Sequence, residues 1–315
     1  MRSKTTKVII LQHGGGELAN QLWTFASIYA YCLEKDFDCQ NYSFFEYGQY
    51  FNIPLKNKLI KFLFFRPFQN HHTRRNNHKN KFWRFIYKIY TKILILIFKN
   101  RVISSINSNG QKTYLPPTQE NNFLIQLEKD NASIYFTGWL FRNPEGLKKY
   151  KNKIIEYFRP KEKYTEPAET RIARARNTYK YIVGVHIRQT DYRTHKNGKY
   201  FITENRIRII LDEYLAFFHK KPQETLFIIM SDEQIQKKIF TGLNIITNNG
   251  NVVEDLYTLS LCDIIIGSNS SFGNFAAYYG NKPHIILQKE TVDWNYYENK
   301  NSYFENKYSV MYERI

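Results

Sequence analysis

A histidine, an arginine and an aspartate follow one apolar segment of this chain and are the residues best suited to chemistry. The segment spans residues 181–193, and three apolar residues in it are typical of a strand covered on both faces: Val183, Val185 and Ile187. His186, Arg188 and Asp191 therefore lie at a strand end, where functional groups of open α/β sheets gather. The fork of Arg188 fits a phosphate and keeps its charge. An ion pair that only holds the loop fits His-x-Arg-x-x-Asp equally well.

A second polar turn follows an apolar strand predicted at residues 264–267. A helix is predicted at residues 272–279, and four polar residues lie between: Ser268, Asn269, Ser270 and Ser271. Hydroxyls and backbone amides at a helix start suit an anion. The plainer interpretation is a serine N-cap. The segment LFIIMSDE places Ser231 and Asp232 after a further buried strand.

Glycines follow the first predicted strand, Val8 to Leu11. Gly14, Gly15 and Gly16 allow close approach of the backbone to a ligand. A helix is predicted next, and Asn20 lies in its first turn, where a helix packed on a sheet more often carries an apolar residue. The spacing fits neither G-x-G-x-x-G nor a Walker loop. A ligand-facing βα junction and a plain tight turn are both open interpretations.

Length and segment order predict two α/β domains with a cleft between them. The chain has 315 residues, enough for two domains of roughly 150 residues. We expect an N-terminal domain over residues 1–165, a C-terminal domain over 178–290, and a tail, 291–315, that packs back on the first domain. The boundary is expected within residues 160–180, where two prolines bracket charged residues.

The net charge of +18 is concentrated in one insertion. Residues 47–119 contain 14 lysines and arginines and no acidic residue. Within them, residues 82–99 predict a basic amphipathic helix with Arg84, Lys88 and Lys92 on one face. Docking on an anionic membrane and an ordinary helix with a solvated basic face are both open. No nucleic-acid-binding motif accompanies the charge, so nucleic acid is not an expected partner.

Cysteine usage and the first residues predict a location in the cytoplasm. If the basic helix docks on a membrane, the protein would lie peripherally on the inner face of that membrane. Cys32, Cys39 and Cys262 are odd in number and lack CxxC spacing. The segment MRSKTTK leads into the first strand without an apolar signal region. Neither an Asp-x-Asp motif nor a carboxylate cluster offers an obvious Mg²⁺ site in the sequence, so we expect no metal and no cofactor.

The combined motifs resemble family-11 glycosyltransferases, the α-1,2-fucosyltransferases. The resemblance rests on GGELANQL, HIRQTDY, SDE and EDLYTLSLCDIIIGSNSSFGNFAA, in that order. It implies the GT-B fold, two Rossmann-like domains of which the second holds the nucleotide sugar. It also implies transfer of L-fucose from GDP-fucose to a hydroxyl of a surface polysaccharide or lipopolysaccharide, with inversion. Another nucleotide sugar on the same fold, or a non-catalytic sugar- or nucleotide-binding protein, are the alternatives.

The resemblance also assigns roles to the motif residues. Arg188 stabilises the leaving phosphate, Asp191 orients the arginine loop, and Asn20 reaches the donor from the first domain. The other donor-binding residues are then Gly15, Gly16, His186, Ser231, Asp232, Asn269, Ser270, Ser271 and Phe272. Asp191 and Glu17 are the candidates for a general base.

This chain departs from the family pattern at the arginine motif. Gln189 stands where a second arginine is usual, and Thr190 stands where glycine is usual. Asn274 and Phe275 replace the tryptophans common after the serine turn. These departures affect the inferred identity of the sugar and of the linkage more than they affect the inference of sugar transfer.

Overall fold

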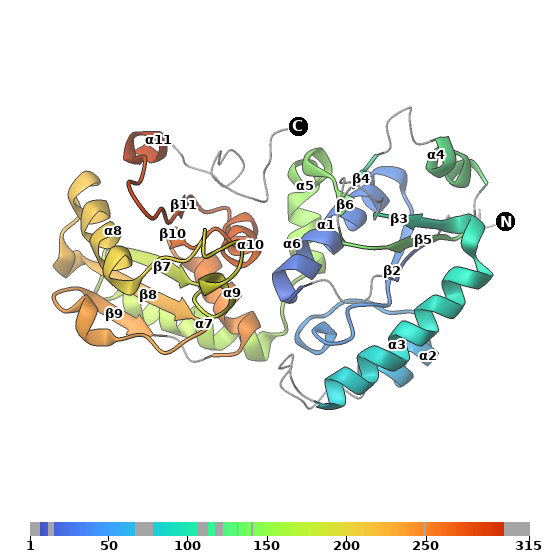
Figure 1. The fold of residues 1–315 in the computed structure, drawn as a ribbon, viewed down its shortest axis with the longest axis horizontal. Helices are drawn as coiled ribbons and strands as arrows, with labels where there is room; N and C mark the ends of the chain where they lie inside the picture. Colours follow the sequence, from blue (N-terminus) through green and yellow to red (C-terminus); the bar gives the residue numbers. More distant parts are fainter. Residues whose placement is uncertain are drawn as a thin grey trace. The chain divides into compact units, whose positions relative to one another are not determined.

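The chain folds into two α/β units, residues 1–159 and residues 160–315 (Figure 1). The computed structural model describes residues 7–11, 16–66, 78–105, 113–116, 122–130, 132–139, 141–247 and 250–298. Each unit is built around a parallel sheet with helices on both faces, so the predicted α/β class of the GT-B type is confirmed.

The first unit has a four-stranded parallel sheet in the order β2-β1-β5-β3. These strands are β1 (Lys7–Ile10), β2 (Asp38–Asn41), β5 (Ile134–Thr137) and β3 (Val102–Ser104). A parallel pair, β4 (Thr113–Tyr114) and β6 (Phe141–Arg142), lies outside it. The helices are α1 (Leu18–Lys35), α2 (Lys58–Ile60), α3 (His78–Ile97), α4 (Asn122–Lys129), α5 (Pro144–Lys149) and α6 (Lys151–Tyr157), with one π-helical turn at Lys61–Phe65.

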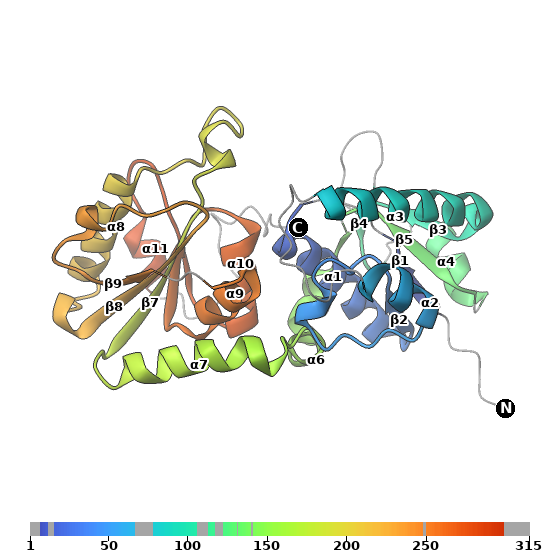
Figure 2. The same cartoon turned by 90° about the horizontal axis from the view of Figure 1, so that it is seen from below.

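Two successive residues of β5 show how the first sheet is covered. Phe136 packs edge to face with Tyr31 of α1, at 6.0 Å between ring centroids. Its neighbour Tyr135 stacks on Phe98, which directly follows α3, at 4.7 Å. Because successive side chains of a strand point to opposite faces, α1 and α3 lie on opposite sides of this sheet (Figure 2).

The second unit has a five-stranded parallel sheet in the order β11-β10-β7-β8-β9. The strands are β7 (Tyr181–Ile187), β8 (Thr225–Ser231), β9 (Asn244–Thr247), β10 (Ile264–Gly267) and β11 (His284–Ile286). The helices are α7 (Glu162–Arg176), α8 (Glu204–Phe217), α9 (Val252–Leu261), α10 (Ser271–Gly280) and α11 (Trp294–Glu298). The strands and the helix predicted between residues 181 and 279 are all present, with ends shifted by a residue or so.

The central strand β7 carries the core on one side and a functional side chain on the other. Val183, Val185 and Ile187 are buried in one cluster with residues of α8. His186 points to the opposite face, where its ring lies 5.0 Å from that of Phe272 in α10. Because side chains alternate along a strand, the face of β7 that α8 covers contributes to the core, and the face toward α10 contributes to the site.

The structure bears on two predictions about the ends of the second unit. The unit begins at Pro160, the first residue of the segment expected to contain the boundary, and most of that segment is helix α7, whose Ala168 and Ile172 are buried. The described part of the predicted tail packs on the second unit rather than the first, because Val292 and Tyr297 belong to its core. Residues 299–315 lie outside the described residues.

The predicted basic helix is present as α3, but one of its three basic residues has a different role. Arg84 forms an ion pair with the buried carboxylate of Glu46, and both nitrogens Nε and Nη2 donate to it. That contact raises the pKa of Arg84 despite the opposing effect of burial. Arg84 is therefore a structural residue, whereas Lys88 and Lys92 are exposed. Within the described residues, no helix has the length and apolar character needed to cross a membrane.

Candidate functional site

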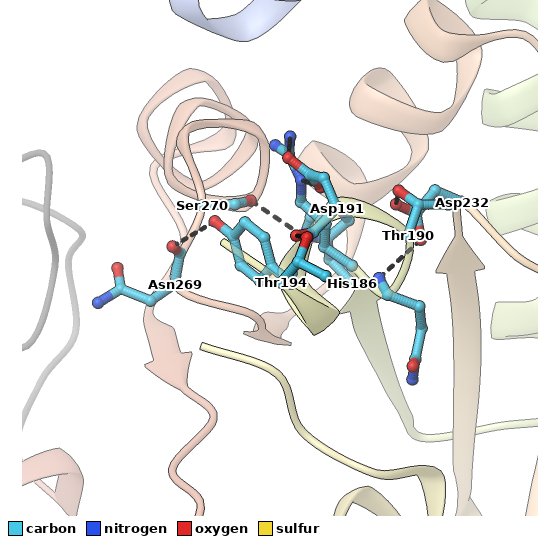
Figure 3. Close-up of polar contacts among 10 residues, drawn as sticks. His186, Thr190, Asp191, Thr194, Asp232, Asn269 and Ser270 are labelled. Atoms are coloured by element: carbon cyan, nitrogen blue, oxygen red, sulfur yellow. Dashed lines mark hydrogen bonds and ion pairs between the residues drawn. The ribbon is translucent and has the colours of Figure 1, made fainter. Parts of the chain in front are cut away.

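The carboxyl ends of β7, β8 and β10 bring the predicted site residues of the second unit together. The three strands are neighbours, since β7 pairs with both β8 and β10. Loops that are 40 to 80 residues apart in the chain therefore meet at one sheet edge (Figure 3). This is the edge at which ligands bind open parallel sheets.

Arg188 is held in place from three directions. Its backbone N–H donates to Ser268 Oγ at 3.0 Å, which ties the β7 loop to the β10 loop. Its Nε and Nη2 donate to the two carboxylate oxygens of Asp191 at 2.8 and 2.7 Å. Its guanidinium carbon lies 4.8 Å from the ring centroid of Tyr192. The guanidinium is thus fixed through one edge.

The hydrogen bond from Arg188 lowers the pKa of the Asp191 carboxyl. Burial disfavours charge on Arg188, but the bond to Asp191 and the nearby Tyr192 leave its pKa raised. Both groups are ionised at neutral pH as a result. Asp191 with a lowered pKa is a poor proton acceptor, so its geometry fits the orientation of Arg188 better than general-base catalysis.

Asp232 connects the β8 end to the arginine loop. Its Oδ1 accepts from the backbone N–H of Gln189 at 2.8 Å, and its Oδ2 accepts from Thr190 Oγ1 at 2.6 Å. The Gln189 side chain turns inward, is 2% exposed and donates to the Ile202 carbonyl at 3.3 Å. Gln189 therefore anchors the loop from inside the protein.

The start of α10 forms the other wall of the site. Ser270 is the N-cap residue, yet in the described structure its hydroxyl makes no capping bond and lies 3.4 Å from His186 Nδ1. The plainer interpretation of a serine at the N-cap position is therefore confirmed, but the Ser270 side chain does not cap the helix. Tyr192 donates from its hydroxyl to the Asn269 carbonyl at 2.9 Å, which joins the serine turn to the arginine loop.

Two buried histidines lie beneath this helix start. A Cβ added to Gly273 would lie 3.2 Å from His284 Nε2 and 3.4 Å from His186 Nδ1, so glycine permits the close approach of α10. Burial, together with the charge of Arg188, lowers the pKa of His186 to about 4. Burial and His186 lower that of His284 to about 3. Both rings are neutral at pH 7, and the site has an uncharged floor.

A cavity of about 660 Å³ opens beside Asp232 at the ends of β8 and β9. Its lining includes the predicted residues Ser231 and Asp232, together with Glu233, Ile235, Lys237 and Thr247. Glu233 also pairs with Arg193 at 2.6 Å. The volume is in the range of small-molecule sites, and two acidic residues line it.

The predicted site residues of the first unit lie around the start of α1. Gly16 has a φ of +85°, and an added Cβ would lie 2.2 Å from Asn20 Nδ2, so glycine is required beside Asn20. Glu17, a candidate base, accepts a hydrogen bond from the Tyr47 hydroxyl at 2.7 Å. Gly15 lies outside the described residues. The contribution of Asn20 stays a prediction.

Tyr192 and Gln189 are the residues whose roles the sequence patterns miss. Tyr192 follows Asp191 directly and is 7% exposed, yet it links the guanidinium to the serine turn. Its position in the HIRQTDY segment is a signal for this role, since a buried tyrosine hydroxyl usually requires a partner. Among the described residues, no group of three or more His, Cys, Asp or Glu side chains is arranged to hold a metal ion.

Residues 165–311 match the model of glycosyl transferase family 11. The matched segment contains the arginine loop, Asp232 and the serine turn described above. No curated protein matches the sequence. The match confirms the resemblance predicted from the motifs and the expectation of a glycosyltransferase.

Solved structures of fucosyltransferases share the fold at low sequence identity. POFUT1 in complex with GDP-fucose is 13% identical, covers 91% of this chain and 98% of its own, and has a TM-score of 0.54. A mutant of Arabidopsis thaliana FUT1 in complex with GDP is 12% identical over 92% of this chain and 72% of its own, at 0.52. NodZ α-1,6-fucosyltransferase soaked with GDP-fucose is 11% identical over 92% and 97%, at 0.51.

Proposed function

We propose that this chain, whose residues 165–311 match the model of glycosyl transferase family 11, transfers L-fucose from GDP-fucose to a hydroxyl group of a glycan, with inversion at the anomeric carbon. The observation that carries the proposal is the guanidinium of Arg188, fixed by Asp191 beside the start of α10. An arginine and a helix N-terminus that converge at a strand end form a site for a diphosphate.

Arg188 stabilises the charge of the leaving group. As the bond between the fucose anomeric carbon and the β-phosphate oxygen breaks, negative charge grows on that oxygen. The acceptor hydroxyl attacks from the opposite face of the sugar and loses its proton. A preorganised donor lowers this barrier most when its orientation is set before the reaction, which is what the bidentate contact to Asp191 provides.

The start of α10 and the loop before it hold the diphosphate. The first backbone amides of a helix have no acceptor within the helix, and the helix dipole favours an anion there. Asn269, Ser270, Ser271 and Phe272 surround this end, and the Ser270 hydroxyl is directed to His186 instead of capping it. Neutral His186 and His284 beneath the turn support it without adding charge.

The cavity beside Asp232 binds the base. Guanine presents two adjacent N–H donors on one edge, whereas the corresponding edges of adenine and uracil each mix donors with acceptors. An ionised carboxylate accepts hydrogen bonds and cannot donate them, so the Asp232 and Glu233 side chains that line this cavity favour a guanine edge. The proposed acceptor is a surface polysaccharide or lipopolysaccharide, as the family resemblance implies, with an α-1,2 linkage.

A nucleotide panel tests the donor. We expect GDP to raise the unfolding temperature of the protein, while UDP, CMP and ADP at equal concentration leave it within error. Asp232→Ala should remove the preference for GDP. A larger response to UDP would assign another nucleotide sugar, and no response to any nucleotide would identify a protein that does not use a nucleotide donor.

The product tests the reaction. GDP-fucose carries a β-linked sugar, so inversion yields an α-fucoside, which the anomeric coupling constant in a proton NMR spectrum distinguishes. Incubation with a panel of glycans that offer a free 2-hydroxyl group should give such a product together with GDP. A β-fucoside would contradict the inverting mechanism.

A further inference from the structure

Helix α3 has a buried face and, opposite to it, an exposed apolar face. Tyr87 is fully buried and Thr91 is 4% exposed, and this side of the helix packs against Phe45 and Phe64. The other side carries large apolar side chains that are 43–75% exposed: Phe82, Phe85, Ile89, Ile93 and Leu96. An ordinary surface helix is polar on its outer side.

These five residues, here called the apolar row, form one continuous stripe. They are separated by three, four, four and three residues. Because successive residues are rotated by about 100° around the helix axis, these separations keep all five on one side of the helix. At about 1.5 Å per residue the row is about 21 Å long. Contiguous exposed apolar surface of this kind marks an interaction site.

A lysine row runs along one flank of the apolar row. At about 100° per residue, Lys81, Lys88 and Lys92 lie within about 40° of one another and next to Phe85 and Leu96. All three are exposed. Arg84 is turned toward the core, where Glu46 neutralises it. The outer face of α3 is thus apolar with a purely basic edge.

We propose that this face docks on an anionic lipid surface, with the apolar row inserted between the headgroups and the lysine row against the lipid phosphates. Charge complementarity selects this occupant. Residues 47–119 contain no acidic residue, so the face offers nothing to a basic partner and carries a net positive edge. Two copies meeting through the face would bring these lysines together without carboxylates from the same segment. This surface does not depend on the function proposed above.

The helix lies in the plane of the membrane. Within the described residues no helix can span a bilayer, and the buried side of α3 remains packed on its sheet. An interfacial helix with an apolar side and a basic side binds with its axis parallel to the surface. Each lysine near an anionic surface contributes roughly a fivefold gain in affinity, which salt reduces over a Debye length of about 8 Å.

Vesicle co-sedimentation separates the two rows. The full chain is expected to sediment with vesicles of phosphatidylglycerol and phosphatidylcholine and only weakly with phosphatidylcholine alone. Phe85→Ser, Ile89→Ser and Ile93→Ser combined should abolish binding. The control Ile209→Ser, which changes a 50% exposed side chain of α8, should not.

The lysine row is tested by charge removal. Lys88→Gln with Lys92→Gln should weaken binding roughly 25-fold. Lys148→Gln with Lys153→Gln, an equal change of charge in α5 and α6, should leave binding near wild type.

A fluorescence measurement reports insertion directly. Phe85→Trp is expected to gain fluorescence that brominated lipid quenches, in a protein whose unfolding temperature is unchanged. The proposal is overturned if wild type does not bind anionic vesicles or if the serine variant binds as wild type does. It is overturned as well if brominated lipid quenches the fluorescence of Phe85→Trp no more than that of wild type, whose four tryptophans set the background. It is also overturned if wild type is a dimer that the serine variant converts to monomers, since a second copy then covers the row.

Discussion

Arg188→Lys separates the chemistry of the site from its stability. Two of the five guanidinium N–H groups point to Asp191, through Nε and Nη2. Within the described residues Nη1 makes no hydrogen bond, so one edge of the fork remains for the donor phosphates. A lysine ammonium keeps the charge but cannot hold Asp191 through two bonds and present a second edge at the same time.

The expected loss is large for turnover and small for folding. Removal of one preorganised transition-state donor costs about 3 to 4 kcal/mol, or roughly a hundredfold to a thousandfold in kcat. The ion pair itself is partly exposed, with 28% of the Arg188 side chain and 52% of the Asp191 side chain accessible. Such pairs contribute at most about 1 kcal/mol to stability, so the unfolding temperature should fall by less than about 4 °C.

Release of GDP from GDP-fucose measures turnover without knowledge of the acceptor. Arg171→Lys is the matched control, because Arg171 pairs with Glu254 at 2.9 Å between α7 and α9 and its side chain is similarly exposed, at 27%. The control should keep wild-type turnover. Near-normal turnover in Arg188→Lys would refute the assigned role, and an equal loss in both variants would show that the effect arises from folding.

Three further predictions concern the same site. Asp191→Asn should lower kcat about tenfold in the GDP-release assay and leave the thermal shift caused by GDP unchanged, because it removes a charge-assisted hydrogen bond that orients Arg188; an unchanged kcat would contradict this positioning role. The pKa of His186 is about 4 in the folded protein and 6.5 in the unfolded chain, so the unfolded state takes up the proton first as the pH falls. The free energy of unfolding, measured in urea titrations, should therefore fall by roughly 3 kcal/mol between pH 6.5 and pH 4. His186→Gln should make this dependence on pH less steep. GDP release should continue in excess EDTA, because Arg188 and the start of α10 supply the positive charge; a strict need for Mg²⁺ or Mn²⁺ would contradict the proposed site.

The positions of the strand ends could be predicted because they depend on local pattern. Apolar residues without alternation define β7, and polar residues directly after it define its end. Parallel strands end at the same edge, so the proximity of Arg188, Asp232 and Ser270 follows from the order of elements. This much of the site is encoded within short segments.

The choice of partners could not be predicted, because it depends on tertiary placement. Arg84 has the spacing of a solvated basic face, but Glu46, 38 residues earlier, lies under it. Val292 and Tyr297 are apolar enough to pack on any core, and the sequence does not specify which. Only the assembled sheets determine these contacts.

Gln189 shows that a residue inside a functional motif can hold a loop in position instead of contributing to the chemistry of the site. The side chain is buried, its N–H is bound to Asp232, and its amide is bound to the Ile202 carbonyl. An arginine introduced there would enter the core beside α8 and leave an unpaired charge, without adding a cation to the phosphates. An arginine placed at this one position would therefore not give the site a second cation, because the loop directs residue 189 toward the core.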